Sequence, residues 1–315
     1  MNWQALKKGE AAVSSKRTII KVAAPTLAAV AVGAVAAVGL TANSPAQKQE
    51  GIASPAGMAD KAPADPAKAF VGQPDDPATW RLPIEAYTTT KSQTSLISAS
   101  RDQLIKKCMA EAGFGQWMPA PDLPTLGGTT LTDWRYGIHN AAQAAKRGYH
   151  PDADAQKAYD KAMMAGAMDK SGADQGQVRS CAQSADAQAP VAQPSQLVET
   201  IKGDSYKEST KDPRVVAVFA QWSACMKAKG YSYKAPLDAV DDPRFHNPYE
   251  VSGLEIATAK ADLDCRSRYP VARTWFDAES ALQIKALKSH QRELDKVKAD
   301  NVSAVSKAAA VAAAK

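Results

Sequence analysis

Two short stretches, Cys108-Met-Ala-Glu-Ala-Gly-Phe114 and Cys225-Met-Lys-Ala-Lys-Gly-Tyr231, share the pattern C-M-x-x-x-G-[FY]. Each follows a segment whose apolar residues recur at helical spacing, such as Val215, Val218 and Trp222 before the second stretch. The Gly stands where a helix ends in a left-handed residue, and the aromatic residue after it can fold back over the last turn. We therefore predict a helix ending at each stretch, and a chain built from two related halves.

A second cysteine follows each stretch, at Cys181 in the first half and at Cys265 in the second. Four cysteines allow three pairings, and we prefer Cys108 with Cys181 and Cys225 with Cys265 because each half then closes on itself. Zinc is the alternative, but the sequence has no C-x-x-C pair and no His at ligand spacing, so we expect neither metal nor cofactor. Disulfides are the default in an oxidising compartment.

The fold class that these patterns predict is mainly α, with two helical, disulfide-closed halves at residues 81–200 and 201–300. The segment from Val271 to the end contains no Gly or Pro, which predicts one long C-terminal helix that packs on its own domain rather than in a dimer zipper. We expect the Ala-rich tail at 301–315 to fray from this helix. The Pro- and Gly-rich stretch at 119–137 is predicted to be a long loop.

The amino-terminal part indicates export. Residues 22–40 carry no charge, and they follow five basic residues and only one acidic one. Residues 1–46 are thus predicted to be a signal peptide or a signal anchor, and both alternatives stay open. Residues 47–80 are rich in Pro and Ala and predict a disordered tether. We expect an extracytoplasmic protein that is either secreted or held in the membrane through residues 22–40 if these are not cleaved.

The charge balance argues against nucleic acid as a partner. The chain has a formal net charge of +6, of which residues 1–46 contribute +4. The remaining +2 is spread over the rest of the chain and gives no clustered basic field.

Three stretches of the second half are distinctive: Trp222-Ser-Ala-Cys-Met-x-x-x-Gly-Tyr-Ser-Tyr233, Glu255-Ile-Ala-Thr-Ala-x-Ala-Asp-x-Asp-Cys265 and Trp275-Phe-x-x-Glu279. Through these stretches the sequence resembles a group of uncharacterised exported actinobacterial proteins. In the first half, Arg135-Tyr-Gly-Ile138 and Arg147-Gly-Tyr149 fit the same group. The resemblance covers roughly residues 95–300 and implies an envelope location and a helical fold. Many members look like lipoproteins, whereas no Cys follows the apolar run of this chain.

Catalytic signatures are sparse. The sequence has no G-x-S-x-G nucleophile elbow, and each cysteine has an expected partner. Asp152-Ala-Asp154 begins like a calcium loop, but Lys157 stands where that loop requires Gly. The four histidines are scattered and are expected at the surface, at His139, His150, His246 and His290. Two carboxylate pairs stay open for glycoside cleavage: Asp262 with Asp264, and Glu250 with Glu255.

An aromatic and basic group around the Pro- and Gly-rich loop is the candidate ligand surface, because aromatic rings beside an Arg can stack on sugars or anchor a protein partner. The alternative, which we favour, is a small core that caps a loop lacking secondary structure. The residues concerned are Trp117, Trp134, Arg135, Tyr136, Tyr149 and Tyr159.

These patterns predict a non-enzymatic extracytoplasmic module that binds an envelope protein or a cell-wall component, with an accessory of an envelope transporter as one version. The first alternative is a cell-wall hydrolase that uses helix-borne carboxylates. The second is a structural wall spacer.

Overall fold

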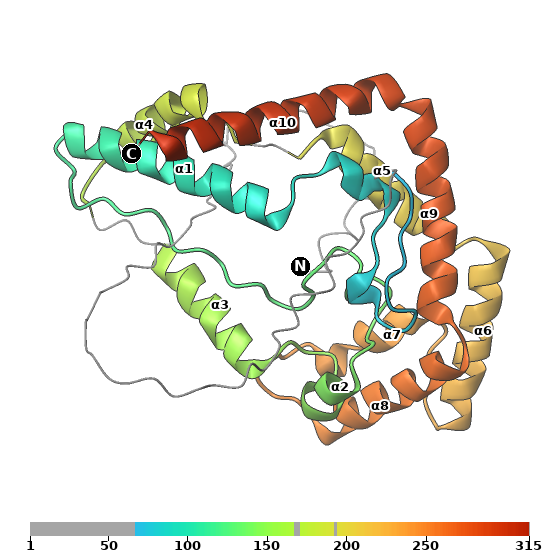
Figure 1. Ribbon diagram of the computed structural model, residues 1–315. Helices are drawn as coiled ribbons and strands as arrows, with labels where there is room; N and C mark the ends of the chain where they lie inside the picture. The colour runs from blue at the N-terminus through green and yellow to red at the C-terminus, as the bar shows by residue number, and fades with distance from the viewer. Residues whose placement is uncertain (1–66, 167–170, 192–193, 315) are drawn as a thin grey trace, which may run out of the picture.

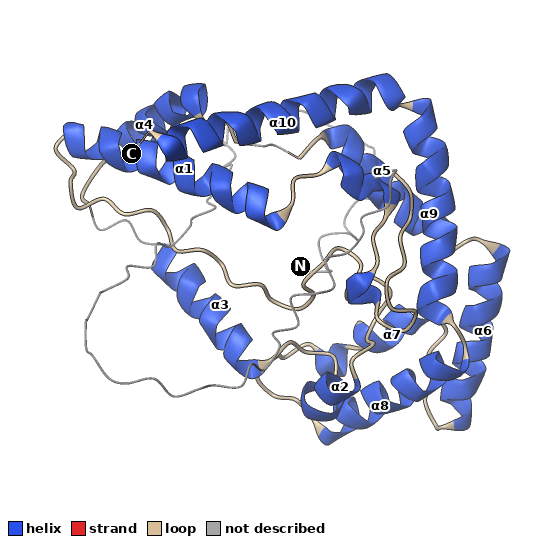
Figure 2. Cartoon of the chain, viewed as in Figure 1, coloured by secondary structure: helices blue, strands red, loops and turns tan. Residues whose placement is uncertain are grey.

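The computed structural model describes residues 67–166, 171–191 and 194–314. Over these ranges the chain is mainly helical and contains no strand (Figures 1 and 2). The expected signal peptide or anchor at 1–46, and residues 47–66 of the expected tether, lie outside the described residues. Within the described ranges, no helix is both long enough and apolar enough to cross a bilayer.

Ten α-helices and three short 3-10 helices make up the described part of the chain. The 3-10 helices are η2 (Pro77–Thr79), η3 (Pro83–Tyr87) and η4 (Pro243–Phe245). The α-helices are α1 (Lys91–Glu111), α2 (Ala141–Arg147), α3 (Ala153–Gly166), α4 (Gln175–Gln188), α5 (Gln196–Ser209), α6 (Pro213–Ala228), α7 (Pro236–Val240), α8 (Gly253–Arg268), α9 (Val271–Ser289) and α10 (Gln291–Ala313).

The repeated motif forms the same helix end twice. In α1, Gly113 has a φ of 91°, and the backbone N–H of Phe114 donates to the carbonyl of Met109 at 2.8 Å. In α6, Gly230 has a φ of 90°, and the N–H of Tyr231 donates to the carbonyl of Met226 at 3.0 Å. This pattern is a Schellman motif, in which the left-handed Gly reverses the chain and the last carbonyls find donors. The predicted ends of both helices are therefore confirmed.

The cysteine that begins each motif joins its helix to a second helix. Cys108 on α1 is bonded to Cys181 on α4, and Cys225 on α6 is bonded to Cys265 on α8, with Cα atoms 5.6 and 5.8 Å apart. The predicted pairing is confirmed. Two disulfides in a small helical protein fit an extracytoplasmic location.

Apolar side chains from both halves meet in a shared core. The central cluster joins η3, α5 and α9 around Trp80, Tyr136, Trp275 and Phe276. A second cluster lies between α6 and α8 around Trp222, and α2 packs on the same α8. Helix α1 packs against α4 and α10 at the other end of the molecule (Figure 1). The division of the sequence near residue 200 is thus not a boundary in the packing, because α1 and α2 each rest on helices from the second half.

The predicted single C-terminal helix is wrong, since it breaks at His290. This residue has a φ of −117° and a ψ of 22°, and α10 runs in a new direction across α1 (Figure 1). The change of direction buries Leu294 in the central cluster and Ala304 and Ala308 against α1, so tertiary burial outweighs the continuity of the helix.

Both ends of the described chain are more ordered than the sequence predicts. The expected fraying tail is helical to Ala313, and the hydroxyl of Ser100 donates to the carbonyl of Ala308 at 2.8 Å. The last part of the expected tether is packed as well. The side chain of Trp80 is 3% exposed, and its indole N–H donates to the carbonyl of Gln73 at 2.7 Å. An aromatic anchor within a Pro-rich stretch thus begins the fold ahead of residue 81.

The disulfides can be tested one at a time by replacing both cysteines of a pair with Ala. We expect each double variant to lose up to about 4 kcal/mol of unfolding free energy, because closing loops of 73 and 40 residues restricts the unfolded chain. Urea denaturation of both variants, and of the wild type with and without reductant, measures this loss. Unfolding midpoints that are unchanged in both variants and in reductant would contradict the assigned role.

Candidate functional site

The six residues predicted as one ligand surface lie in four separate places. Trp117 is buried beside the Cys108–Cys181 disulfide. Tyr149 is buried in the cluster between α6 and α8, where it stacks on Phe245, and Tyr159 is half-buried on α3. The remaining three, which are consecutive in the loop between α1 and α2, are Trp134, Arg135 and Tyr136.

A buried carboxylate holds this loop against α9. The side chain of Glu279 is fully buried, and it accepts from Arg135 Nε at 2.9 Å and Nη2 at 2.6 Å. The hydroxyl of Tyr136 donates to the same carboxylate at 2.8 Å, and Gln283 Nε2 donates at 2.9 Å. Burial raises the pKa of Tyr136 well above its ordinary value, so the hydroxyl stays protonated and donates. The guanidinium of Arg135 also stacks over the ring of Tyr206, 4.3 Å from its centroid.

Further contacts fix the backbone of the loop on both sides of these residues. The Arg266 Nη1 atom of α8 donates to the carbonyl of Tyr136 at 2.6 Å. Gly137 follows with a φ of 104°, and a Cβ atom at this position would collide with the guanidinium of Arg266. On the other side, the hydroxyl of Thr132 donates to the carbonyl of Trp80 at 2.9 Å. The loop thus bridges the η2 segment, α8 and α9.

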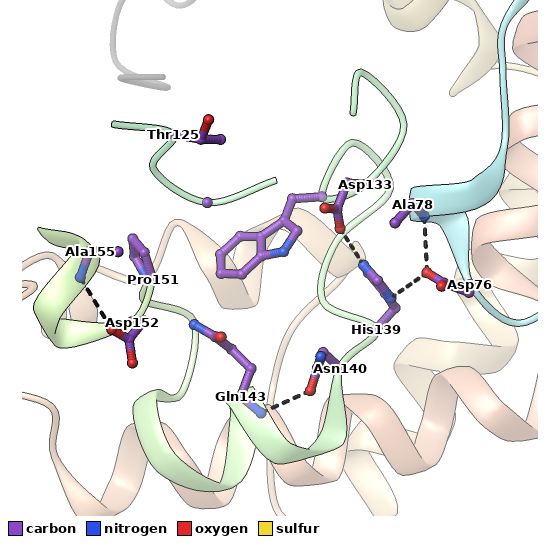
Figure 3. A pocket seen from close by; sticks show the side chains of 12 residues that line it. Asp76, Ala78, Thr125, Asp133, His139, Asn140, Gln143, Pro151, Asp152 and Ala155 are labelled. Atoms are coloured by element: carbon purple, nitrogen blue, oxygen red, sulfur yellow. Dashed lines mark hydrogen bonds and ion pairs between the residues drawn. The ribbon is translucent and has the colours of Figure 1, made fainter. Parts of the chain in front are cut away.

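The residue between Asp133 and Arg135, Trp134, lines a pocket of about 280 Å³, and Figure 3 labels ten of the other lining residues. Its indole N–H has no hydrogen-bond partner among the described residues. The loop, the η2 segment, α2 and the start of α3 form the walls. The lining residues are Asp76, Ala78, Thr125, Gly127, Asp133, Trp134, His139, Asn140, Gln143, Pro151, Asp152 and Ala155.

One wall of the pocket contains a histidine held between two carboxylates (Figure 3). His139 Nε2 lies 2.6 Å from Asp133 Oδ1, and Nδ1 lies 3.6 Å from Asp76 Oδ1. The other oxygen of Asp133 accepts from the backbone N–H of Thr129 at 2.6 Å and from its hydroxyl at 3.0 Å. Both ring nitrogens therefore face a carboxylate of the protein, and the imidazole ties the loop to the η2 segment.

The opposite wall comes from the starts of two helices. Asn140 caps α2 by accepting from the N–H of Gln143 at 3.0 Å, and the Gln143 amide donates to the carbonyl of His150. Asp152 accepts from the backbone N–H groups of Asp154 at 2.9 Å and Ala155 at 3.2 Å. These hydrogen bonds lower the pKa of Asp152, so its carboxylate stays ionised at neutral pH.

The lining is acidic. It contains three Asp side chains and no Lys or Arg, and His139 supplies at most one positive charge. Among the described residues, no group of three or more His, Cys, Asp or Glu side chains is placed to hold a metal ion. The pocket therefore offers an aromatic face, a free indole N–H and negative charge to a molecule that enters it.

The sequence pattern predicts Trp134 as a residue of the ligand surface, but it does not predict the acidic side chains that line the same pocket. His139 was expected at the surface, whereas its side chain is 16% exposed and paired with Asp133. The sequence draws attention to Asp152 only through an incomplete calcium-loop pattern, whereas in the structure this residue caps the start of α3. Asp76 lies far from the loop in sequence, and no spacing pattern links it to His139. The one sequence signal for this pair was the short separation of Asp133 and His139 within the same loop.

The two carboxylate pairs left open by the sequence do not share a cleft. Asp262 is fully buried and accepts from the indole N–H of Trp222 at 2.7 Å and from Arg266 Nε at 2.6 Å. Asp264 instead faces Lys229 at 2.6 Å on the outside of α8. In the second pair, Glu255 is fully buried, whereas Glu250 is exposed. None of these four carboxylates lines the pocket.

Comparison with models of known protein families, with curated proteins and with solved structures found no match.

The Glu279→Gln variant tests how the loop is held. The amide keeps an acceptor for Tyr136 but leaves the buried guanidinium of Arg135 without a counter-charge, so we expect a loss of about 3 kcal/mol in unfolding free energy. Urea denaturation measures it. Asp277→Asn on the same helix is the control, because this exposed partner of Arg273 should contribute less than about 1 kcal/mol. Equal effects of the two substitutions would contradict the assignment.

Proposed function

We propose that this chain is a non-enzymatic, extracytoplasmic binding module of the bacterial cell envelope, and that it binds a small ligand in the pocket around Trp134. The observation that carries the proposal is the indole itself. A large aromatic side chain, whose N–H has no hydrogen-bond partner among the described residues, lines a pocket whose walls are held by hydrogen bonds. Concave sites with an aromatic surface and a few placed polar groups are the usual form of small-molecule sites.

The proposed location rests on covalent and sequence features. The two disulfides fit an oxidising compartment. The uncharged stretch at 22–40, preceded by basic residues, is typical of a signal peptide or an anchor. In this proposal the folded part works outside the cytoplasmic membrane, either secreted or held by residues 22–40, and passes its ligand to an envelope protein such as a transporter or presents it to the wall.

Binding is favoured over catalysis by how the pocket's acid–base groups are engaged. General acid–base catalysis needs a group with a free position toward the reacting atoms. Both nitrogens of His139 face carboxylates of the protein, so the imidazole has no free position toward a reacting atom. Asp262 and Glu255, one member of each carboxylate pair considered for the hydrolase alternative, are fully buried.

Native mass spectrometry of the purified full chain tests the proposal. After incubation with the low-molecular-mass fraction of an envelope extract, we expect an adduct of defined mass that saturates and is lost in Trp134→Ala. Tyr249→Ala is the control, because Tyr249 is an exposed aromatic residue away from the pocket. Soluble fragments released from purified peptidoglycan, and abolished by Asp152→Asn, would establish a hydrolase instead. An absence of any saturable adduct would leave a structural spacer and overturn the proposal.

A further inference from the structure

The walls of the Trp134 pocket also define a ligand chemistry, on the premise that the proposed binding function holds. Figure 3 shows Asp152 at one end of the pocket and Asp76 and Asp133 at the other, and Trp134 belongs to the same lining. We propose that the ligand is a linear alkyl diamine, with an ammonium group at each acidic end and its methylene chain across the indole.

The charges of the lining residues favour a cationic ligand over an anionic one. Three carboxylates line the pocket, and a fully protonated His139 would offset only one of them. An anion such as a carboxylate or phosphate ester would enter against this field, whereas an ammonium ion is attracted by it. The carboxylate of Asp152 is charged in the neutral range, and the backbone N–H groups of Ala155 and Asp154 lower its pKa further.

Cations near the pocket lie outside its lining, and two of them, Lys146 and Arg147, attract the carboxylate of Asp152 and help to lower its pKa. Lys91 Nζ donates to the hydroxyl of Thr125 at the wall, 2.6 Å away. Arg147 Nε donates to the carbonyl of Pro151 at 2.9 Å, and its Nη2 donates to the carbonyl of Pro248 at 2.6 Å. The guanidinium of Arg147 is therefore held by backbone oxygens and does not close an ion pair across the pocket.

The indole supplies the middle of the site. Trp is the side chain whose ring face attracts a cation most strongly, and its apolar surface also covers methylene groups. The pocket volume of about 280 Å³ suits a short chain rather than a large ring system. Two charged ends separated by an aromatic surface thus distinguish a diamine from a monoamine, which can satisfy only one end.

Four ligands of matched length test this assignment on the full chain by isothermal titration calorimetry. These are 1,4-diaminobutane, 1-aminobutane, 1,4-butanediol and succinate. We expect the diamine to bind, the monoamine to bind about tenfold more weakly because one charge-assisted contact is missing, and the diol and the dianion not to bind. Binding of the diamine should weaken as the ionic strength rises from about 0.1 M to about 1 M, since the Debye length shortens.

Variants locate the site. Asp152→Asn should weaken the diamine about tenfold, because it removes one charge and keeps the cap of α3. Trp134→Ala should weaken it to a similar extent. Asp154→Asn is the matched control, because this neighbouring carboxylate is 91% exposed and outside the lining. Binding of the diol or succinate as tight as that of the diamine, or an unchanged affinity in Asp152→Asn, would overturn the ligand assignment.

The two proposals fail differently. If none of the four compounds binds but the envelope extract still gives an adduct that requires Trp134, the diamine assignment is wrong and the binding module stands. If the extract gives no adduct either, both proposals fall.

Discussion

The arrangement of the pocket depends on the buried ion pair between the carboxylate of Glu279 and the guanidinium of Arg135. The carboxylate is fully buried and accepts from Arg135, Tyr136 and Gln283, so it joins a long loop to α9. A buried charge is costly unless it is paired and hydrogen-bonded, and Arg135 meets both needs. The same contact holds Arg135 and Tyr136 against α9, whereas the preceding residue, Trp134, lines the pocket. A single buried pair thus decides which aromatic residue of the loop is available to a ligand.

The disulfides and the polar contacts of Glu279 stabilise different parts of the structure. The disulfides join α1 to α4 and α6 to α8, each one residue before the methionine of a Schellman motif. The motif ends the helix sharply and brings its aromatic residue over the last turn, so the cysteine lies at a well-defined height on the helix. The loop between α1 and α2 lacks such local rules, and polar contacts to the η2 segment, α8 and α9 hold it instead. Disulfides and helix-end motifs thus stabilise the helices, whereas hydrogen bonds and a buried ion pair stabilise the loop that forms the wall of the pocket.

Local sequence rules predicted the helical fold, both helix ends at Gly113 and Gly230, and the disulfide pairing, because each depends on a short pattern. The break at His290 was missed because no Gly or Pro marks it, and only the burial of Leu294 and Ala308 explains it. The candidate site was predicted in part. Trp134 was named, but the pairing of His139 with Asp76 depends on how distant segments pack, which periodicity does not encode.

Hydrogen–deuterium exchange of the loop tests the central claim most directly. The N–H of Arg135 donates to the carbonyl of Thr132, and that of Gly137 donates to the carbonyl of Trp134. We expect peptides covering residues 129–137 to exchange slowly in the wild type, and we expect this protection to be lost in Glu279→Gln while that of α6 and α8 persists. Unchanged protection of the loop in Glu279→Gln would contradict the claim that this carboxylate holds the wall of the pocket.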